Sequence, residues 1–360
     1  MLNAKRKRYH FEIFVFIFLL ILGTILFAQN NEFPSYDLPI MLPPKLTSVF
    51  GEYRKSKMES SPHFHSGVDF SVDWQVGKKI VSAQDGYVKR VVVDENDIYG
   101  DRIVLAHREG YVTLYSHFSA FAGNVQKIIE MLKEEFGDNR IEITFKPNDV
   151  NVKRGQIIGY SGKTGDALIP HCHFEVRSEN EKWVYNPLFF LRLNADGSTM
   201  RIKKITIDGV DYKSDEIKDS VVHVDGPQFP RMSISTDEEN RKNTQGIYKI
   251  QMYANDNLIF ELRFDKMKME EFRKTSILYG ITYDTYDYYT YKLTIPSDVS
   301  LSPIKINKIH SIMLNKNKKI KIKIIVSNFW GREKEIEFFL KGDRMHKEAD
   351  KIGKENIVHK

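Results

Sequence analysis

The sequence is poor in cysteine, and its excess of positive charge is small. Cys172 is the only cysteine among 360 residues, which excludes a disulfide within the chain and a structural zinc site built from several cysteines. The net charge is +6, but lysine and arginine are interspersed with acidic residues along most of the chain. This charge alone does not distinguish a nucleic-acid partner from an anionic cell envelope. With 41% hydrophobic and 28% charged residues and no internal repeat, the composition is that of a folded protein with room for two domains.

The first residues carry the pattern of an export signal. A basic stretch at residues 5–8 precedes an apolar run from Ile13 to Phe27, and the sequence turns polar after Ala28. This order predicts a signal peptide over residues 1–28, with export to the periplasm or cell envelope. Leu26 is larger than the residue usually found at that distance from a cleavage site, so an uncleaved inner-membrane anchor is the alternative. We expect no nucleic-acid partner, because such a role fits poorly with export.

Proline, glycine and polar residues divide the rest of the chain into two regions rich in short apolar runs. Four prolines predict an extended linker over residues 29–48, and a change of composition near 194–198 marks a boundary. We therefore expect one domain over 49–193, a second over 194–342, and a charged tail over 343–360.

Most of the apolar runs read as strands joined by tight turns. Asp85-Gly86 and Glu109-Gly110 predict hairpins in the first domain, and residues 254–257 and 328–331 predict hairpins in the second. Helical periodicity occurs at residues 125–136, which predicts a helical insertion over about residues 123–137. The expected fold is mainly β: an antiparallel sheet domain followed by an immunoglobulin-like β-sandwich.

Two distant segments carry candidate metal ligands. The first contains His65 and Asp69, and the second is His171-Cys172-His173. Side chains of a strand alternate between its faces, so His171 and His173 should share one face while Cys172 points to the other. Two imidazoles and one carboxylate around a zinc ion would leave a fourth coordination position open, as in catalytic zinc sites.

Gly67 and Val68 separate the first two candidates and favour an extended backbone over a helix. In such a segment the even spacing of His65 and Asp69 again places both on one face. We expect Gly67 to leave room for the metal.

Five short motifs occur along residues 49–193, and together they resemble the lysostaphin/LytM-type zinc endopeptidases, which cut peptidoglycan peptides. The motifs, in chain order, are His65-x-Gly67-x-Asp69, Tyr115-Ser116-His117, Gly155-Gln156-Ile157-Ile158-Gly159, Ser161-Gly162-Lys163-Thr164-Gly165 and His171-x-His173-Phe174-Glu175. The resemblance covers about two-fifths of the chain.

The resemblance implies one Zn²⁺ per chain, bound by His65, Asp69 and His173. It also implies two catalytic histidines that are not ligands, His117 and His171. One would take a proton from water and pass it to the leaving amine, and the other would stabilise the oxyanion. The sequence leaves their order open, and we favour His171 as the base because it neighbours a ligand.

Other features near these motifs have more than one interpretation. Glu175 would either orient a ligand imidazole or face solvent, and His63 would either support a ligand or play no part. His107 is expected at the surface. Cys172 stands where the family usually has an apolar residue, which a buried cysteine can replace. The segment between the second and third motifs is longer than usual, which leaves the substrate preference open.

The motif series predicts an exported zinc metalloendopeptidase that hydrolyses peptidoglycan stem peptides or crosslinks. The alternative is a non-catalytic envelope protein that binds or regulates other wall hydrolases through the same groove. No ligand of the motif series is missing, which favours the enzyme. In the second region, the tyrosines between Tyr283 and Tyr291 could stack on sugars, but core packing is their commoner use.

Overall fold

The computed structural model describes residues 33–56, 62–137, 140–194, 198–240, 243–280 and 288–343. The predicted signal or anchor lies outside the described residues, as does the charged tail from residue 344 onward. In the part of the chain that is described, no helix combines the length and the apolar character needed to cross a membrane.

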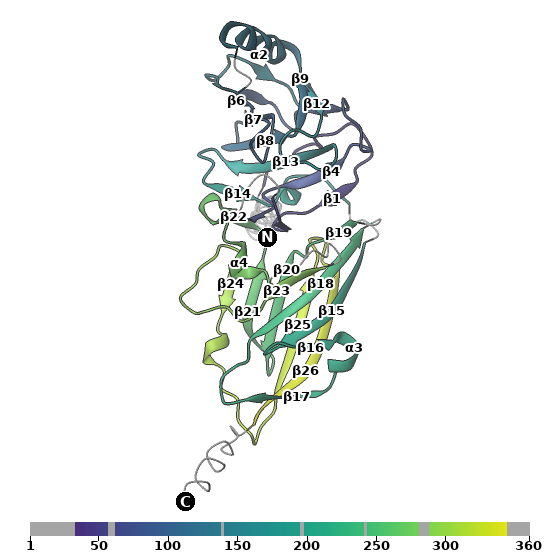
Figure 1. The fold of residues 1–360 in the computed structure, drawn as a ribbon, viewed down its shortest axis with the longest axis vertical. Coiled ribbons are helices and arrows are strands. Elements are labelled where there is room, and N and C mark those ends of the chain that lie inside the picture. Colours follow the sequence, from purple (N-terminus) through teal and green to yellow (C-terminus); the bar gives the residue numbers. More distant parts are fainter. Residues whose placement is uncertain are drawn as a thin grey trace, which may run out of the picture. The chain divides into compact units, whose positions relative to one another are not determined.

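A ten-stranded sheet forms the centre of the first region, and β13 lies in its middle (Figure 1). Six of the eight residues of β13 are buried, and Phe174 packs edge-to-face on Tyr115 of β8. The sheet order is β1 (Leu46–Ser48), β4 (Val68–Ser71), β13 (His171–Ser178), β8 (Tyr111–Ser116), β7 (Arg102–Ala106), β6 (Gly86–Val93) and β10 (Ile141–Thr144), with β11 (Asn151–Val152), β14 (Trp183–Tyr185) and β22 (Lys266–Lys268) attached at its sides.

Two smaller sheets complete this region. One joins β5 (Lys79–Val81), β12 (Ile157–Ser161) and β9 (Phe118–Phe121), and the other joins β2 (Tyr53–Arg54) and β3 (His63–Phe64). A short 3-10 helix, Pro187–Phe189, follows β14. Part of the range predicted as a linker belongs to this fold, because β1 pairs with β4 and Ile40 forms a bridge with Ile80.

The predicted hairpin at Asp85-Gly86 is wrong, whereas the other three are confirmed. β5 pairs with β12, and β6 pairs with β7, so the strands on either side of this dipeptide belong to different sheets. Gly86 is needed for a close approach rather than a turn, since a Cβ there would lie 2.2 Å from the carbonyl oxygen of Ala106. The strand pairs β7–β8, β20–β21 and β25–β26 form the remaining hairpins.

The predicted helix corresponds to α2 (Gly123–Phe136), which lies beside β9 and β10. Val125 and Ile129, one turn apart, are its buried residues and form the apolar face. Gly137 ends the helix in the left-handed conformation, with φ of 64°, and its N–H donates to the carbonyl oxygen of Lys133.

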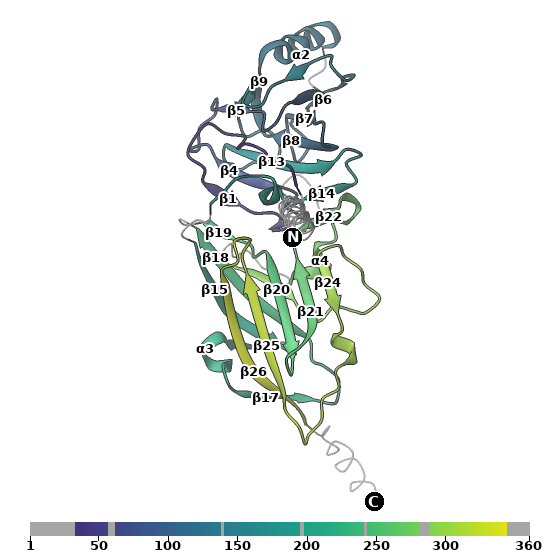
Figure 2. The ribbon, with the colours of Figure 1, turned by 180° about the vertical axis from the view of Figure 1, so that it is seen from behind.

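The second region contains two sheets (Figure 2). Their buried side chains belong to one apolar core. Ile205 and Ile234 come from one sheet, and Met252, Ile324 and Phe338 come from the other. The five-stranded sheet contains β16 (Val210–Lys213), β15 (Thr199–Ile207), β18 (Met232–Asn240), β19 (Asn243–Gln245) and β23 (Tyr289–Lys292); the six-stranded sheet contains β17 (Val221–Asp225), β26 (Glu333–Asp343), β25 (Ile320–Ser327), β20 (Lys249–Ala254), β21 (Asn257–Arg263) and β24 (Ile304–Asn307). Short helices α3 (Ser214–Ile217) and α4 (Thr275–Leu278) and the 3-10 helices Met269–Glu271 and Ile309–Ser311 connect these strands.

The mainly β, antiparallel fold class is confirmed. Among the described strands, every pairing is antiparallel except that of β17 with β26. The immunoglobulin-like type and the exact domain boundaries remain predictions. β22 comes from the second region but pairs with β14, so the two regions share a sheet.

Of the tyrosine-rich stretch, Tyr291 is buried in the core and serves packing, while residues 281–287 lie outside the described residues.

Candidate metal centre and active site

Strand pairing brings the predicted site residues together. In the register of the sheet, His173 on β13 lies opposite Asp69 on β4 and opposite Ser116 on β8. His65 directly follows β3, and His117 directly follows β8. The central strand therefore joins motifs that lie far apart in the sequence.

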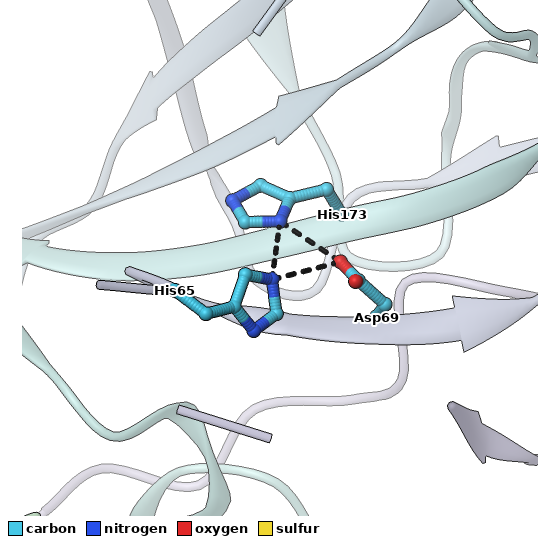
Figure 3. Close-up of side chains that lie close together, drawn as sticks. All are labelled: His65, Asp69 and His173. Atoms are coloured by element: carbon cyan, nitrogen blue, oxygen red, sulfur yellow. Dashed lines mark hydrogen bonds and ion pairs between the residues drawn. The ribbon is translucent and has the colours of Figure 1, made fainter. Parts of the chain in front are cut away.

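His65, Asp69 and His173 converge on one point, as Figure 3 shows. The Nε2 atom of His65 lies 3.1 Å from Oδ1 of Asp69 and 3.0 Å from Nδ1 of His173. The third side of the triangle, from His173 Nδ1 to Asp69 Oδ1, is 2.9 Å. All three side chains are buried, and each offers one atom that could bind a metal ion.

Each of the two imidazoles forms a second hydrogen bond, on the ring nitrogen that faces away from Asp69. These hydrogen bonds determine which nitrogen of each ring is protonated. Nδ1 of His65 lies 2.8 Å from the carbonyl oxygen of Val49, and Nε2 of His173 lies 2.9 Å from Oε1 of Glu175. Both oxygens only accept, so these two nitrogens carry the protons. The nitrogens that face Asp69 then present lone pairs, and three electron-rich atoms meet at hydrogen-bonding distance. Such an arrangement requires a cation at its centre.

The electrostatics of the site support the same conclusion. Burial raises the pKa of Asp69, but the surrounding histidines outweigh burial and hold it well below its usual range, so the carboxylate is ionised. Burial lowers the pKa of His173, but hydrogen bonds to Asp69 and Glu175 outweigh it and raise the pKa to about 9. Without a metal, a proton on His173 supplies the required positive charge. A zinc ion with tetrahedral preference and nitrogen and oxygen ligands fits the same place.

Gly67 has a packing role that the sequence did not predict. A Cβ at Gly67 would lie 2.4 Å from the carbonyl oxygen of Phe174 and 2.9 Å from the ring of His173. The missing side chain therefore leaves room for strand β13 and a ligand ring, which the sequence could not reveal. Cys172 is buried, as expected for the opposite face of the strand, and burial raises the pKa of its thiol.

His117 and His171 lie side by side next to the three candidate ligands. Their ring centroids are 4.6 Å apart, and Nε2 of His171 is 3.6 Å from Oδ1 of Asp69. Nδ1 of His117 donates to the carbonyl oxygen of Thr164, and Nδ1 of His171 donates to that of Ile169, both over 2.8 Å. Each ring therefore keeps Nε2 as its proton acceptor.

Both rings are electrically neutral in this environment. Burial, together with the neighbouring imidazoles, lowers the pKa of His117 well below its usual value, and burial also lowers the pKa of His171. His117 adopts the left-handed conformation with φ of 64°, which is uncommon outside glycine. Strain of this kind is concentrated at functional sites.

Glu175 orients the candidate ligand His173, and it belongs to a buried network that the sequence did not predict. Its side chain is fully buried and holds His173 through Oε1, which also accepts a hydrogen bond of 2.5 Å from Ser66. Its Oε2 accepts from Nε of Arg177 over 2.5 Å, and Arg177 in turn donates to the hydroxyl of Tyr99. The alternation of β13 could have identified Arg177, since residues 173, 175 and 177 share one face.

We expect the Glu175→Gln variant to bind zinc roughly 10–100-fold more weakly, the usual effect of losing an outer partner of a ligand. Ser66, His173 and Arg177 all donate hydrogen bonds to this carboxylate. In the variant, the amide nitrogen of glutamine would face one of these donors and could not accept its hydrogen bond. Competition with a chromogenic chelator measures the affinity, and Glu179→Gln, at an exposed position, is the matched control. Equal affinities for the two variants would contradict the orienting role.

His63 and His107, the two remaining histidines near the motifs, lie outside the cluster of candidate ligands. His63 stacks on Phe272 with ring centroids 4.8 Å apart, and it contributes no atom to the cluster. His107 is buried rather than at the surface as predicted. Its ring nitrogens lie within hydrogen-bonding distance of the carbonyl oxygen of Asp85 and the hydroxyl of Thr113. These two residues belong to neighbouring segments of the same sheet region, which leave the ring little contact with solvent.

Comparison with known proteins agrees with the motif series. Residues 63–131 match the model of Peptidase family M23. Over 147 residues the chain is 25% identical to the DD-carboxypeptidase/endopeptidase Mpg of Neisseria meningitidis serogroup B, which covers 41% of this chain and 27% of that protein. Over 133 residues it is 31% identical to the peptidoglycan DD-endopeptidase ShyA of Vibrio cholerae serotype O1, which covers 37% of this chain and 24% of that protein.

Among solved structures, the catalytic domain of the antimicrobial peptidase lysostaphin from Staphylococcus simulans aligns with 40% of this chain and 90% of its own, with 24% identity and a TM-score of 0.29. The chain spans about a quarter of the length of the curated relatives it matches. The matched segment contains His65, Asp69 and His117 of the site described above. The chain thus carries a peptidase domain of family M23, the lysostaphin/LytM-type family.

Proposed function

We propose that this chain is a zinc metalloendopeptidase that hydrolyses peptide bonds in peptidoglycan stem peptides or crosslinks. The observation that carries the proposal is the completeness of the site. Three buried donor atoms converge on a place that requires a cation, and two neutral imidazoles lie beside them. A non-catalytic relative would not need both the donors and the proton acceptors.

The surrounding residues suit the hydrolysis of an amide. A zinc ion held by His65, Asp69 and His173 would polarise the scissile carbonyl and make a water molecule more acidic. Nε2 of His117 or of His171 would accept a proton from that water and return it to the leaving amine. The other imidazole would donate from Nε2 to the oxyanion that develops on the carbonyl, after it takes up a further proton from solvent. The position of His171 Nε2, 3.6 Å from Asp69 Oδ1, favours His171 as the base.

Two further points support peptidoglycan as the substrate and the cell envelope as the location. The matched relatives include a peptidoglycan DD-endopeptidase and a DD-carboxypeptidase/endopeptidase. The basic and apolar N-terminal pattern is that of an exported protein. We propose on these grounds that the chain acts in the periplasm or cell envelope.

Digestion of purified peptidoglycan, followed by mass spectrometry of the released fragments, tests the proposal directly. We expect fragments cut at peptide bonds, with no cut between sugars. If the protein contains zinc but releases no fragment, the alternative of a non-catalytic regulator of other wall hydrolases replaces the enzyme.

Removal of the metal should abolish the activity reversibly. Treatment with a chelator is expected to stop fragment release, and a stoichiometric addition of Zn²⁺ should restore it, because a proton on His173 can balance the charge but cannot polarise the carbonyl or acidify water as zinc does. The bound metal per chain, measured by elemental analysis, should be one. Fragment release that persists in chelated, zinc-free protein would contradict the proposal.

A further inference from the structure

A segment at the start of the first region, residues 46–54, supports the first metal ligand; we call it the support loop. Nδ1 of His65 donates to the carbonyl oxygen of Val49 over 2.8 Å. The backbone of His65 is also held on both sides: Gly51 N–H donates to its carbonyl oxygen over 2.8 Å, and its own N–H donates to that of Glu52 over 2.7 Å. The loop therefore sets both the position and the protonated nitrogen of this imidazole.

The support loop holds the second ligand as well. The hydroxyl of Thr47 donates to the carbonyl oxygen of Asp69 over 3.1 Å. The guanidinium of Arg54 lies 3.7 Å from Oδ2 of Asp69, the carboxylate oxygen that does not face the other ligands. This contact directs the remaining oxygen, Oδ1, toward His65 and His173.

The support loop is in turn held by residues of the second region. Gln245 donates from its amide to the carbonyl oxygen of Leu46 over 2.8 Å, and the hydroxyl of Tyr279 donates to that of Gly51 over 2.6 Å. Gly51 has φ of +87°, and a Cβ there would lie 2.3 Å from the ring of Phe264. The loop backbone thus packs tightly against the second region at the point where it contacts His65.

Glu52 connects the two sets of contacts. Only 1% of this residue is exposed, and its Oε1 accepts from the backbone N–H of Val49 and from that of Gly246, over 3.1 and 2.8 Å. Its Oε2 is 2.7 Å from the guanidinium of Arg54. These three groups are all donors, and Gly246 belongs to the second region. A buried charge of this kind is costly unless it is fully paired, and here the pairing fixes one geometry of the loop.

We propose that the second region is a working part of the metal centre: it positions His65 and Asp69 through the support loop, with Glu52 as the connecting residue. The proposal rests on the metal site of the proposed function but not on hydrolysis. It gives the second region a role in metal affinity that a separate substrate-binding module would not have.

The test compares two variants of the full chain by zinc affinity, measured by competition with a chromogenic chelator. Glu52→Gln keeps the shape but turns an amide nitrogen toward a donor, and we expect a loss of affinity of roughly 10–100-fold. Tyr279→Phe removes only the hydroxyl that holds Gly51, and we expect a smaller loss, on the order of threefold to tenfold. Bound Co²⁺ should show a changed visible absorption spectrum in both variants, because the ligand geometry shifts.

Matched controls separate positioning from general stability. Glu335→Gln changes an exposed glutamate of β26, and Tyr253→Phe changes a half-buried tyrosine of β20; both should bind zinc as the unaltered chain does. Affinities are measured far below the melting temperature of each metal-free variant. If Glu52→Gln does not fold, Tyr279→Phe decides alone.

The outcomes distinguish this inference from the proposed function. Zinc affinities within twofold of the unaltered chain in the folded variants, with an unchanged Co²⁺ spectrum, overturn the positioning role and leave the peptidase proposal intact. Failure of the unaltered chain to bind zinc overturns both.

Discussion

Replacement of His173 by alanine is expected to abolish both zinc binding and the release of peptidoglycan fragments. His173 supplies one of three protein donors and is hydrogen-bonded to Asp69 and Glu175. Binding of zinc to structural sites with four protein ligands is worth about 10–16 kcal/mol, so one ligand contributes roughly 3 kcal/mol, a factor of more than about 100 in affinity. Loss of the imidazole also removes one hydrogen-bond donor from the buried carboxylate of Glu175, which lowers the stability of the folded variant.

The measurement is zinc content and fragment release of the purified variant. His223→Ala is the matched control, since His223 is an exposed histidine of β17 in the second region. A zinc-free His173→Ala protein that releases fragments at the rate of the unaltered chain would overturn the assignment of the metal centre.

Asparagine at His117 or at His171 should reduce turnover strongly while zinc stays bound. Neither imidazole belongs to the three converging donors, so metal content should not change. General acid–base catalysis contributes on the order of 10²–10⁴-fold, and an amide cannot accept a proton at neutral pH. Asparagine also tolerates the left-handed backbone of His117 better than most residues, so the variant should fold.

The two variants also separate the roles of the two histidines. An amide can still donate a hydrogen bond, so the position that stabilises the oxyanion should keep more activity than the position of the base. We expect His171→Asn to be the more damaging change. Turnover of both variants equal to that of the unaltered chain, with zinc bound, would contradict the catalytic roles of His117 and His171.

The buried network behind the ligands explains how a site with no disulfide nearby stays organised. Glu175, Arg177, Tyr99 and Ser66 are connected by hydrogen bonds behind His173. Such connected partners keep a ligand in one orientation before the metal binds. The support loop keeps the ring of His65 in one orientation through the carbonyl oxygen of Val49. The metal centre is thus held by both regions of the protein.

Several features of the first region depend on segments that lie far apart in the chain. The Asp85-Gly86 dipeptide was expected to form a hairpin, which is wrong, and the packing role of Gly67 was not predicted. Both glycines instead allow another strand to come close, at Ala106 and at Phe174. The sequence shows that a glycine is present, but the partner that requires it comes from a segment far away in the chain. The prediction that His107 lies at the surface is wrong for the same reason, since the carbonyl oxygen of Asp85 that its ring contacts comes from another segment of the chain.

The sequence by itself determined the strand pattern, the helix near residues 125–136 and the identity of the converging residues. Period-two alternation is local, so His171 and His173 could be placed on one face without any knowledge of their neighbours. Only the tertiary structure decided that three lone pairs meet at a point that needs a cation, and that Glu175 is buried and orients a ligand. It also decided that residues 46–54 connect the metal centre to the second region. These features depend on which distant segments pair and pack, and neither the spacing nor the periodicity of a single segment encodes that choice.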